Sequence, residues 1–269
     1  GAGENEKLVG RAIKGRRQEA ILATKFGYVG SEQGGLKIDG SPAQVIRACE
    51  ASLRRLATDY IDVYYLHRVD KTVPITETVG AMEELRREGK IRAIGLSEAG
   101  IHTLEAAGRI ADIDVLQSEF SLATPDLSNE MIPYLEANNI ALAAFSPLSR
   151  GMLTEMASYI DMAVDDYRRL IPRFDEENYR LNLSIVREME SIAKDLGCGL
   201  ATLALAWVLA SAKNTIPIPG TRQLSHLKEN IPALDLSFNE DVYDRLSKLA
   251  GSFHGDRHNP VNAAFYDQA

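Results

Sequence analysis

The chain has 269 residues, of which 45% are hydrophobic, and it can therefore bury the core of one large α/β domain or of two small ones. Its formal net charge of -8 and its pI near 5.3 argue against nucleic acid or an anionic membrane as the main partner, because both require clustered Lys and Arg. No apolar run is long enough to span a bilayer, and no signal-peptide pattern opens the chain. The charge therefore favours a small molecule as the partner. Cys49 and Cys198 lie far apart within helical patterns, so we expect no disulfide framework and a cytoplasmic protein.

Strands and helices alternate along most of the chain. The expected strands are short apolar runs, at 20–24, 61–66, 91–96, 113–116, 140–145 and 215–218. The expected helices have apolar residues at helical spacing, at 4–14, 42–56, 77–88, 102–107, 127–137, 179–196, 200–211, 222–231 and 239–249. Ser41 and Thr76 are the expected N-caps of two of these helices.

Three stretches have no regular pattern. Residues 28–41 are rich in Gly, Ser and charge and are expected to form a loop. Residues 150–178 are too long for a connecting turn and are a candidate functional loop. Residues 251–269 form a polar tail with no clear element. Because no change in composition marks a linker, we expect residues 1–269 to form a single domain.

Strands that alternate with helices predict right-handed crossovers and a parallel sheet. Six such strands fit a doubly wound open sheet, whereas a (β/α)8 barrel needs two more, which would have to precede Gly1. The strand pattern alone slightly favours the open sheet, and the chemistry at the strand ends is what favours the barrel.

Most of the predicted strands end in polar side chains that could converge at one edge of the sheet, namely Lys25, His67, Ser97 with Glu98, Gln117 and Ser146. A lysine at the mouth of an apolar strand is partly desolvated, and its charge can lower the pKa of a neighbouring hydroxyl. A histidine beside it can donate a hydrogen bond to a substrate oxygen or carry a proton. Taken singly, Lys25 is about equally well explained as a functional group or as a solvated lysine at a strand end. His67 is likewise about equally well explained as a functional group or as a structural histidine.

The turn Pro219-Gly220-Thr221-Arg222 suits an anion. Glycine lets the backbone approach the ligand, Thr221 can cap the following helix, and Arg222 supplies a planar cation for a phosphate. An ordinary N-cap beside a surface arginine is the alternative. No GxGxxG or P-loop motif is present, so a Rossmann-type dinucleotide site is not supported. His254 and His258, with Asp256 between them, could share a helix face, but a metal site would need a helix in this Gly-containing tail and further ligands, so no metal site is expected.

The strand ends, taken together, resemble the aldo-keto reductases, and most closely their single-domain bacterial, plant and fungal branch. The resemblance rests on segments that follow one another in the family's order: Gly3-Glu4-Asn5-Glu6, Ala23-Thr24-Lys25-Phe26-Gly27, Tyr65-Leu66-His67-Arg68, Gly95-Leu96-Ser97-Glu98, Leu116-Gln117-Ser118-Glu119-Phe120-Ser121-Leu122, Phe145-Ser146-Pro147-Leu148-Ser149-Arg150-Gly151, Ile218-Pro219-Gly220-Thr221-Arg222 and Leu227-Lys228-Glu229-Asn230. It covers nearly the whole chain and implies a (β/α)8 TIM barrel that binds NADPH at the carboxyl ends of its strands.

The same resemblance implies a role for each matching residue. Lys25 would tune a catalytic tyrosine, and His67 would orient the substrate carbonyl. Ser97 and Gln117 would hold the nicotinamide carboxamide, with Glu98 beside them, and Phe120 would stack under the nicotinamide ring where the family more often has tyrosine. The cofactor's pyrophosphate would lie along a segment that contains Ser146, Pro147, Leu148, Arg150 and Gly151. Its adenosine end would meet Gly220, Thr221, Arg222, Glu229 and Asn230, with Arg222 on the 2'-phosphate.

The chain departs from the family pattern at its start. The family's catalytic tyrosine and aspartate, together with the first two barrel strands, would lie before Gly1. We expect the given chain to be part of a longer protein, because a barrel without two strands exposes two unpaired edges; a natural truncation is the alternative.

These observations predict an NADPH-dependent oxidoreductase that reduces an aldehyde or ketone to an alcohol, with small carbonyl compounds as substrates and a homo-oligomer as a possible assembly. A catalytically weak NADPH-binding sensor or channel-associated subunit is the main alternative. An unrelated barrel enzyme such as an isomerase is a weaker one, because adenosine-type groups follow the turn at Arg222.

Overall fold

The computed structural model describes residues 3–30, 36–154, 162–259 and 265–267. Its strands are β1 (Ala23–Phe26), β2 (Tyr28–Gly30), β3 (Leu36–Ile38), β4 (Ile61–Leu66), β5 (Ile91–Ser97), β6 (Val115–Glu119), β7 (Ala141–Phe145) and β8 (Thr215–Pro217). Its helices are α1 (Glu4–Ala12), α2 (Pro42–Leu56), α3 (Ile75–Arg87), α4 (Ile101–Gly108), α5 (Met131–Ala137), α6 (Glu176–Asp195), α7 (Leu200–Ser211), α8 (Leu224–Asn230) and α9 (Glu240–Ala250).

The chain divides into two compact units. Unit 1 comprises Gly1–Gln117 and Phe265–Ala269, and unit 2 comprises Ser118–Ala264. The main sheet has the strand order β1-β4-β5-β6-β7-β8, and β6 runs across the boundary between the units. That residues 1–269 act as a single domain stays a prediction.

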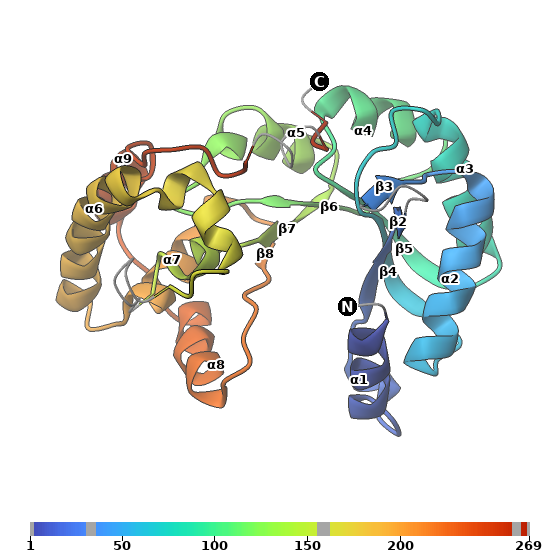
Figure 1. Ribbon diagram of the computed structural model, residues 1–269, viewed down its shortest axis with the longest axis horizontal. Coiled ribbons are helices and arrows are strands. Elements are labelled where there is room, and N and C mark those ends of the chain that lie inside the picture. Colours follow the sequence, from blue (N-terminus) through green and yellow to red (C-terminus); the bar gives the residue numbers. More distant parts are fainter. Residues whose placement is uncertain (1–2, 31–35, 155–161, 260–264, 268–269) are drawn as a thin grey trace. The chain divides into compact units, whose positions relative to one another are not determined.

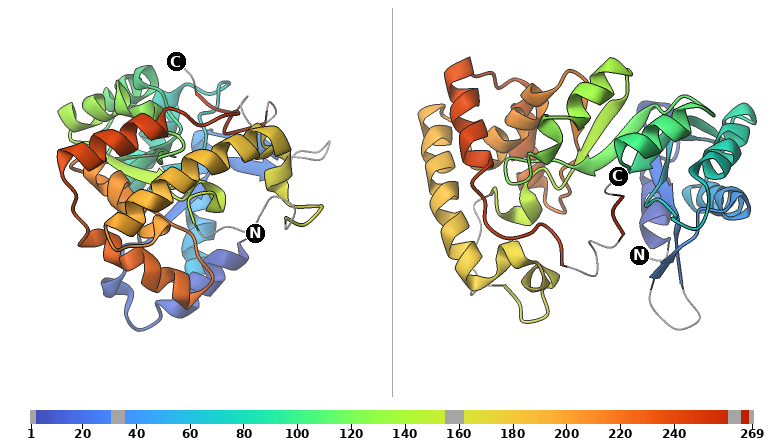
Figure 2. Two further views of the ribbon diagram at one scale, coloured as in Figure 1. Left: turned by 90° about the vertical axis from the view of Figure 1, so that its left-hand side faces the viewer. Right: turned by 90° about the horizontal axis from the view of Figure 1, so that it is seen from above.

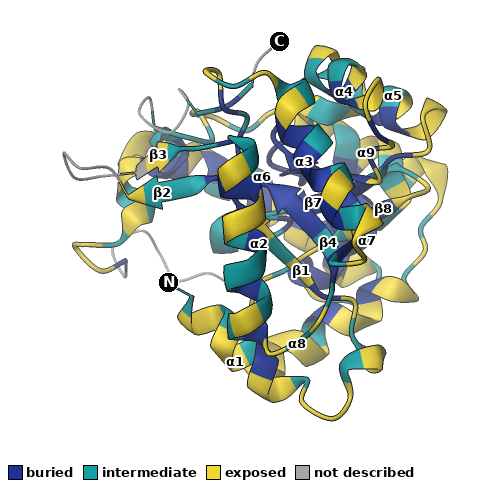
Figure 3. Cartoon of the chain, turned by 90° about the vertical axis from the view of Figure 1, so that its right-hand side faces the viewer, coloured by how far each residue is buried: buried dark blue, intermediate teal, exposed yellow. Residues whose placement is uncertain are grey.

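Unit 1 is built on parallel strands that are connected by helices. Strands β1, β4, β5 and β6 pair in parallel in that order. Helices α2 and α3 pack against each other outside strands β4 and β5 (Figure 1). Figure 3 shows buried residues along the strands and exposed residues along one side of α2. The buried residues on α2 include Val45 and Cys49, as their helical spacing predicts.

Local signals explain where α2 begins and ends. The Ser41 hydroxyl accepts a hydrogen bond from the backbone N–H of Gln44 at 3.4 Å, and Pro42 occupies the first helical position. The helix ends at Ala57, whose backbone is left-handed with φ of 51°. The N-cap predicted at Ser41 is therefore confirmed.

Unit 2 contains the other end of the main sheet and the apolar helix α7. Strands β7 and β8 pair in parallel, with Ala143 beside Ile216. Helix α7 is buried from Leu200 to Val208 because nearly all of its side chains are apolar. Helices α6 and α9 lie side by side (Figures 1 and 2).

The structure corrects several predicted boundaries. Strand β1 covers residues 23–26 and not 20–24, so Lys25 lies within the strand. The predicted loop 28–41 contains the antiparallel pair β2–β3. Helix α3 begins at Ile75 after Pro74 with no side-chain cap, so the predicted N-cap at Thr76 is wrong. Residues 150–178 hold short 3-10 turns and the first residues of α6 in their described part.

Among the described residues, no single helix has both the length and the apolar composition of a membrane span; α6 and α7 reach them only together, across a bend of 88°. Within the same ranges, no three His, Cys, Asp or Glu side chains are placed to hold a metal ion.

Candidate functional site

In unit 1, Lys25 lies on the same face of the sheet as two residues of the neighbouring strands. It is in register with Tyr65 on β4, and Tyr65 is in register with Gly95 on β5. A Cβ atom on Gly95 would lie 2.3 Å from Cδ1 of Tyr65, so the Tyr65 ring occupies the space that any side chain at position 95 would fill. The glycine therefore allows the ring to cross β5.

The Tyr65 ring leads to Gln117, which lies on β6. The two side chains are hydrogen-bonded, and both residues are buried. Burial raises the pKa of the Tyr65 phenol to about 12, which keeps it protonated at neutral pH. Lys25, Tyr65 and Gln117 therefore follow one another across the strands of unit 1.

His67 directly follows β4, at its carboxyl end. Its backbone N–H donates to the carbonyl oxygen of Phe26 at 2.8 Å, and its ring meets the Tyr28 ring edge-on at 4.7 Å between centroids. Burial, together with the positive charges of Arg68 and Lys25, lowers the pKa of His67 from 6.5 to about 3. A neutral imidazole is therefore the expected form at neutral pH.

Lys25 is also electrostatically perturbed. Although the side chain reaches solvent, desolvation by the surrounding protein lowers the pKa of its ammonium group, and the charge of Arg68 adds to this effect. Lys25 and His67 are thus brought close enough for their charges to interact, as the sequence predicts for the strand ends.

Arg68 connects these groups, although the sequence patterns gave it no role of its own. It is buried, and its Nη1 donates to the His67 carbonyl oxygen at 2.6 Å and to Ser97 Oγ at 3.2 Å. Its Nη2 donates to the Tyr266 hydroxyl at 3.3 Å, and its guanidinium lies 4.7 Å from the centre of the Tyr266 ring. The sequence signal that could have identified it is its place directly after His67.

Residues 265–267 also pack against this end of unit 1. Phe265 meets the Tyr28 ring at 6.2 Å between centroids. Asp267 accepts hydrogen bonds from the Gly100 backbone N–H at 3.0 Å and from the Thr103 hydroxyl at 2.6 Å, at the start of α4. The described residues of the polar tail form no helix or strand, as predicted, but these contacts anchor them.

Ser97 is the last residue of β5, Glu98 follows it, and Gln117 lies within β6; all three residues are buried. The backbone N–H of Glu98 donates to the Gln117 carbonyl oxygen at 2.9 Å. Glu98 has a left-handed backbone with φ of 53°, which is uncommon for a residue with a side chain and occurs where a local geometry is required. Ser97 is in register with Gln117 on the neighbouring strand, and the contacts of the three residues with a nicotinamide stay a prediction.

The depressed pKa of His67 predicts a loss of stability in acid. Between pH 6.5 and about 3, the unfolded chain binds a proton at this imidazole and the folded chain does not, so lowering the pH favours unfolding. We expect the unfolding free energy of the wild type to fall by roughly 1–2 kcal/mol relative to His67→Gln between about pH 7 and 4.5, after allowance for solvent screening. Urea unfolding of both proteins at each pH measures this change. If the wild type kept or gained stability relative to His67→Gln as the pH fell, the neutral imidazole would be contradicted.

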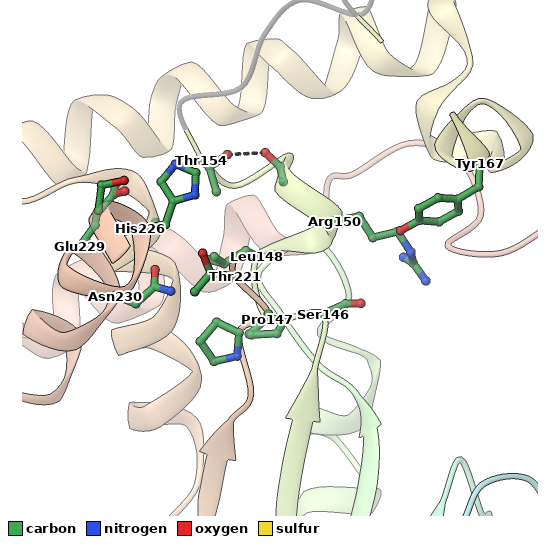
Figure 4. Close-up of a pocket in the computed structure, with 15 residues that line it drawn as sticks. Ser146, Pro147, Leu148, Arg150, Thr154, Tyr167, Thr221, His226, Glu229 and Asn230 are labelled. Carbon is green, nitrogen blue, oxygen red and sulfur yellow. Dashed lines mark hydrogen bonds between the residues drawn. The ribbon is translucent and has the colours of Figure 1, made fainter. Parts of the chain in front are cut away.

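In unit 2, a cavity of about 700 Å³ lies beside the turn that follows β7. One wall includes Ser146, Pro147, Leu148, Arg150 and Gly151, and the other includes Gly220, Thr221, Glu229 and Asn230. In Figure 4, Ser146 and Pro147 lie at the end of a strand, and Glu229 and Asn230 lie on a helix across the cavity. The structure thus gathers these predicted cofactor-binding residues around one space.

The turn 146–151 has an unusual backbone. Ser146, Ser149 and Arg150 have φ of 50°, 45° and 56°, and Gly151 has φ of 98°. The Ser149 N–H donates to the Ser146 carbonyl oxygen at 2.8 Å, and the Gly151 N–H donates to that of Leu148 at 2.9 Å. A Thr154 hydroxyl holds the end of the turn by donating to the Gly151 carbonyl oxygen at 2.7 Å (Figure 4).

The opposite wall is formed by the turn at Gly220 and by α8. Open space adjoins Gly220, since a Cβ built there would meet nothing within 4 Å. The prediction that Thr221 caps the following helix is wrong, because α8 begins at Leu224 and the Thr221 hydroxyl accepts instead from the Gln223 N–H at 3.1 Å. Arg222 is exposed and is not among the residues that line the cavity.

Phe120 lies in the interior of unit 2. It is fully buried, and its ring stacks on Trp207 with 5.2 Å between ring centroids and 28° between ring planes. This packing gives the predicted stacking under a nicotinamide no support, and that role stays a prediction.

Several residues of the cavity were missed by the sequence patterns. Thr154, Tyr167, Ser225 and His226 line it together with the predicted residues (Figure 4). His226 could have been found from its place on α8, because it lies one helical turn before the predicted pair Glu229 and Asn230.

Comparison with known proteins finds relatives that match most of the chain. The sequence model of the Aldo/keto reductase family matches residues 1–250. Probable aldo-keto reductase 1 of Glycine max is 42% identical over 241 residues, which are 89% of this chain and 70% of that protein.

Solved structures agree with the sequence match. A glycerol dehydrogenase from Gluconobacter oxydans has a TM-score of 0.86 and 27% identity, covering 96% of this chain and 80% of that one. An aldo/keto reductase from Klebsiella pneumoniae, solved with NADP and acetate, has a TM-score of 0.72 and 29% identity, covering 92% of this chain and 76% of that one. Another from the same organism, solved with NADPH, has a TM-score of 0.72 and 27% identity over 99% of this chain and 80% of that one. The chain, with its parallel strands and alternating helices, therefore belongs to the aldo/keto reductase family, whose fold is the (β/α)8 barrel.

Proposed function

We propose that this protein reduces an aldehyde or ketone to the corresponding alcohol with NADPH as the hydride donor, in the cytoplasm. The observation that carries the proposal is the cavity of about 700 Å³ in unit 2, whose walls are the two turns predicted to bind the cofactor. Its volume is in the range of small-molecule and cofactor sites. Family membership and the Klebsiella pneumoniae structures solved with NADP and NADPH support the choice of ligand.

The residues of the cavity fit a phosphate-bearing nucleotide. Hydroxyl groups of Ser146, Thr221 and Ser225 can donate to phosphate or ribose oxygens. The open space at Gly220 admits a close approach of the ligand to the backbone. The Asn230 amide has both donors and an acceptor, which suits a heterocyclic base. In the same proposal, the exposed Arg222 binds the 2'-phosphate that distinguishes NADPH from NADH.

NADPH, when bound, supplies the hydride for the carbonyl carbon of the substrate. His67 is kept neutral by its surroundings, so its ring N–H can donate a hydrogen bond to the substrate oxygen while the imidazole stays uncharged. Lys25 places a partly desolvated positive charge beside it, which favours the anionic form of a nearby hydroxyl and so assists proton transfer to the same oxygen. Ser97 and Gln117 offer hydroxyl and amide groups for the cofactor's carboxamide.

Paired measurements of binding and turnover test this proposal. We expect the full-length protein to bind NADPH in an isothermal titration and to oxidise it, followed at the nicotinamide absorbance, when a panel of short aldehydes and ketones is added. Binding without turnover on any member of the panel would favour the sensor or channel-associated alternative. Failure to bind NADPH would contradict the proposal.

A further inference from the structure

The turn 146–151 adopts a backbone that is unfavourable for its own sequence. Three of its residues with side chains, Ser146, Ser149 and Arg150, lie in the left-handed region. Each such residue costs free energy relative to an ordinary conformation, so contacts elsewhere must stabilise the turn. The two backbone hydrogen bonds within the turn are of a kind that many turns possess, and the Thr154 hydroxyl contacts only its last residue, so these bonds do not by themselves select this conformation.

A buried carboxylate holds the turn from the adjacent strand. Glu119 lies at the end of β6, and its side chain is completely buried. Arg150 donates to it with both terminal nitrogens, Nη1 to Oε1 and Nη2 to Oε2, at 3.1 Å each. This bidentate geometry fixes both the position and the orientation of the guanidinium, which a single hydrogen bond does not.

The same carboxylate gathers other basic groups. Arg257 Nη1 lies 3.8 Å and His258 Nε2 lies 3.5 Å from Glu119 Oε2. The Thr124 hydroxyl donates to Glu119 Oε1 at 3.4 Å, and it accepts from Arg173 Nη1 at 2.7 Å. Removal of the Glu119 charge would leave several cationic groups close together with less to compensate them, so Arg150 would lose its fixed place.

We propose that Glu119 is a positioning residue for nucleotide binding, because it clamps Arg150 and thereby holds the turn 146–151 in the strained conformation that forms one wall of the cavity. The inference rests on the proposed function, since it takes the nucleotide to be the ligand of that cavity. Glu119 itself is not among the residues that line the cavity, so it acts through Arg150.

The proposal is tested by coupling between the two residues. We expect Glu119→Gln and Arg150→Met each to raise the Kd for NADPH about tenfold, because the competent form of the turn is then a minor population. The double variant should bind no more weakly than either single variant, since both remove the same clamp. In Glu119→Gln, whose changed side chain does not line the cavity, the kcat at saturating NADPH should stay within about twofold of the wild type, while the KM for NADPH rises.

Asp62→Asn is the matched control. Asp62 is another carboxylate that is mostly buried and accepts from two arginines, Arg17 at 2.6 Å and Arg92 at 3.1 Å, but it is not among the residues that line the cavity. We expect this variant to lower the melting temperature and to leave the Kd for NADPH unchanged. An equal rise in Kd for Asp62→Asn would show a general loss of stability and would overturn the inference.

Hydrogen exchange separates this inference from the proposed function. In the protein without nucleotide, peptides that cover 146–151 should exchange faster in Glu119→Gln than in the wild type and should not change in Asp62→Asn. Unchanged exchange in Glu119→Gln, an unchanged Kd, or additive effects in the double variant would each overturn the role of Glu119. A wild type that fails to bind NADPH would contradict the proposed function, and the exchange result would still decide whether Glu119 holds the turn.

Discussion

Replacement of Lys25 by methionine is expected to lower kcat for carbonyl reduction by about 10²–10⁴-fold, the usual contribution of acid–base catalysis. Methionine keeps an unbranched side chain of similar length but removes the ammonium charge. Without that charge, a neighbouring hydroxyl has a higher pKa and no longer assists proton transfer at the substrate oxygen. Steady-state rates of NADPH oxidation over a range of substrate concentrations measure the effect.

A change at a second lysine separates this effect from a general loss of positive charge. Lys71 is exposed on the loop after β4, so Lys71→Met should keep the wild-type kcat. The Kd of the Lys25→Met protein for NADPH should change little, because Lys25 is proposed to act on a hydroxyl and not on the cofactor, and it is not among the residues that line the cavity. Full activity of Lys25→Met would remove Lys25 from the catalytic proposal.

The largest expected loss of stability follows from removing the Trp207 side chain. Trp207 is 1% exposed, and its ring stacks on Phe120 and on Tyr243, the latter at 6.1 Å between centroids. Its Nε1 donates to Ser247 Oγ at 3.2 Å. Trp207→Ala leaves a large cavity among these groups and should lower the unfolding free energy by about 3–5 kcal/mol, measured by urea unfolding.

Two further substitutions test whether the loss of unfolding free energy comes from the stacked rings. Trp207→Phe keeps an aromatic ring for Phe120 and Tyr243, so it should cost clearly less than Trp207→Ala. Leu170→Ala shortens an apolar side chain that is 68% exposed, and it should change the unfolding free energy by less than about 0.5 kcal/mol. If Trp207→Ala were as mild as Leu170→Ala, the stacked rings would not be central to the stability of unit 2.

Elements with local signals in their own residues could be predicted from the sequence. The helix after Ser41 begins where its hydroxyl and the following proline predict, and α7 is buried because its residues are apolar on every side. The family match confirms the barrel class. The strand pattern alone favoured an open sheet, and the barrel was predicted from the resemblance of the strand-end residues to the family. The three-residue strands β2 and β3 were missed because such short runs show no alternation that periodicity can detect.

The candidate site shows the same division. Residues that follow a strand directly, such as His67 and Ser146, could be predicted because parallel strands bring their carboxyl ends to one edge. Glu119 is the last residue of such a strand, but its proposed role depends on Arg150, and it also lies near the tail residue His258; both are distant in the sequence. No local pattern connects these residues, so only the folded chain reveals the clamp. Arg68 was overlooked for the related reason that its partner Tyr266 comes from the tail.

The proposed reaction transfers a hydride from NADPH to the carbonyl carbon of the substrate. It is tested most directly with NADPH in which both C4 hydrogens of the nicotinamide are replaced by deuterium, and with an aldehyde that the full-length protein reduces. Mass spectrometry of the product should find one deuterium on the carbon that was the carbonyl carbon, and His67→Ala should form that product much more slowly. An alcohol product without deuterium, or no product from any carbonyl compound despite bound NADPH, would contradict the account.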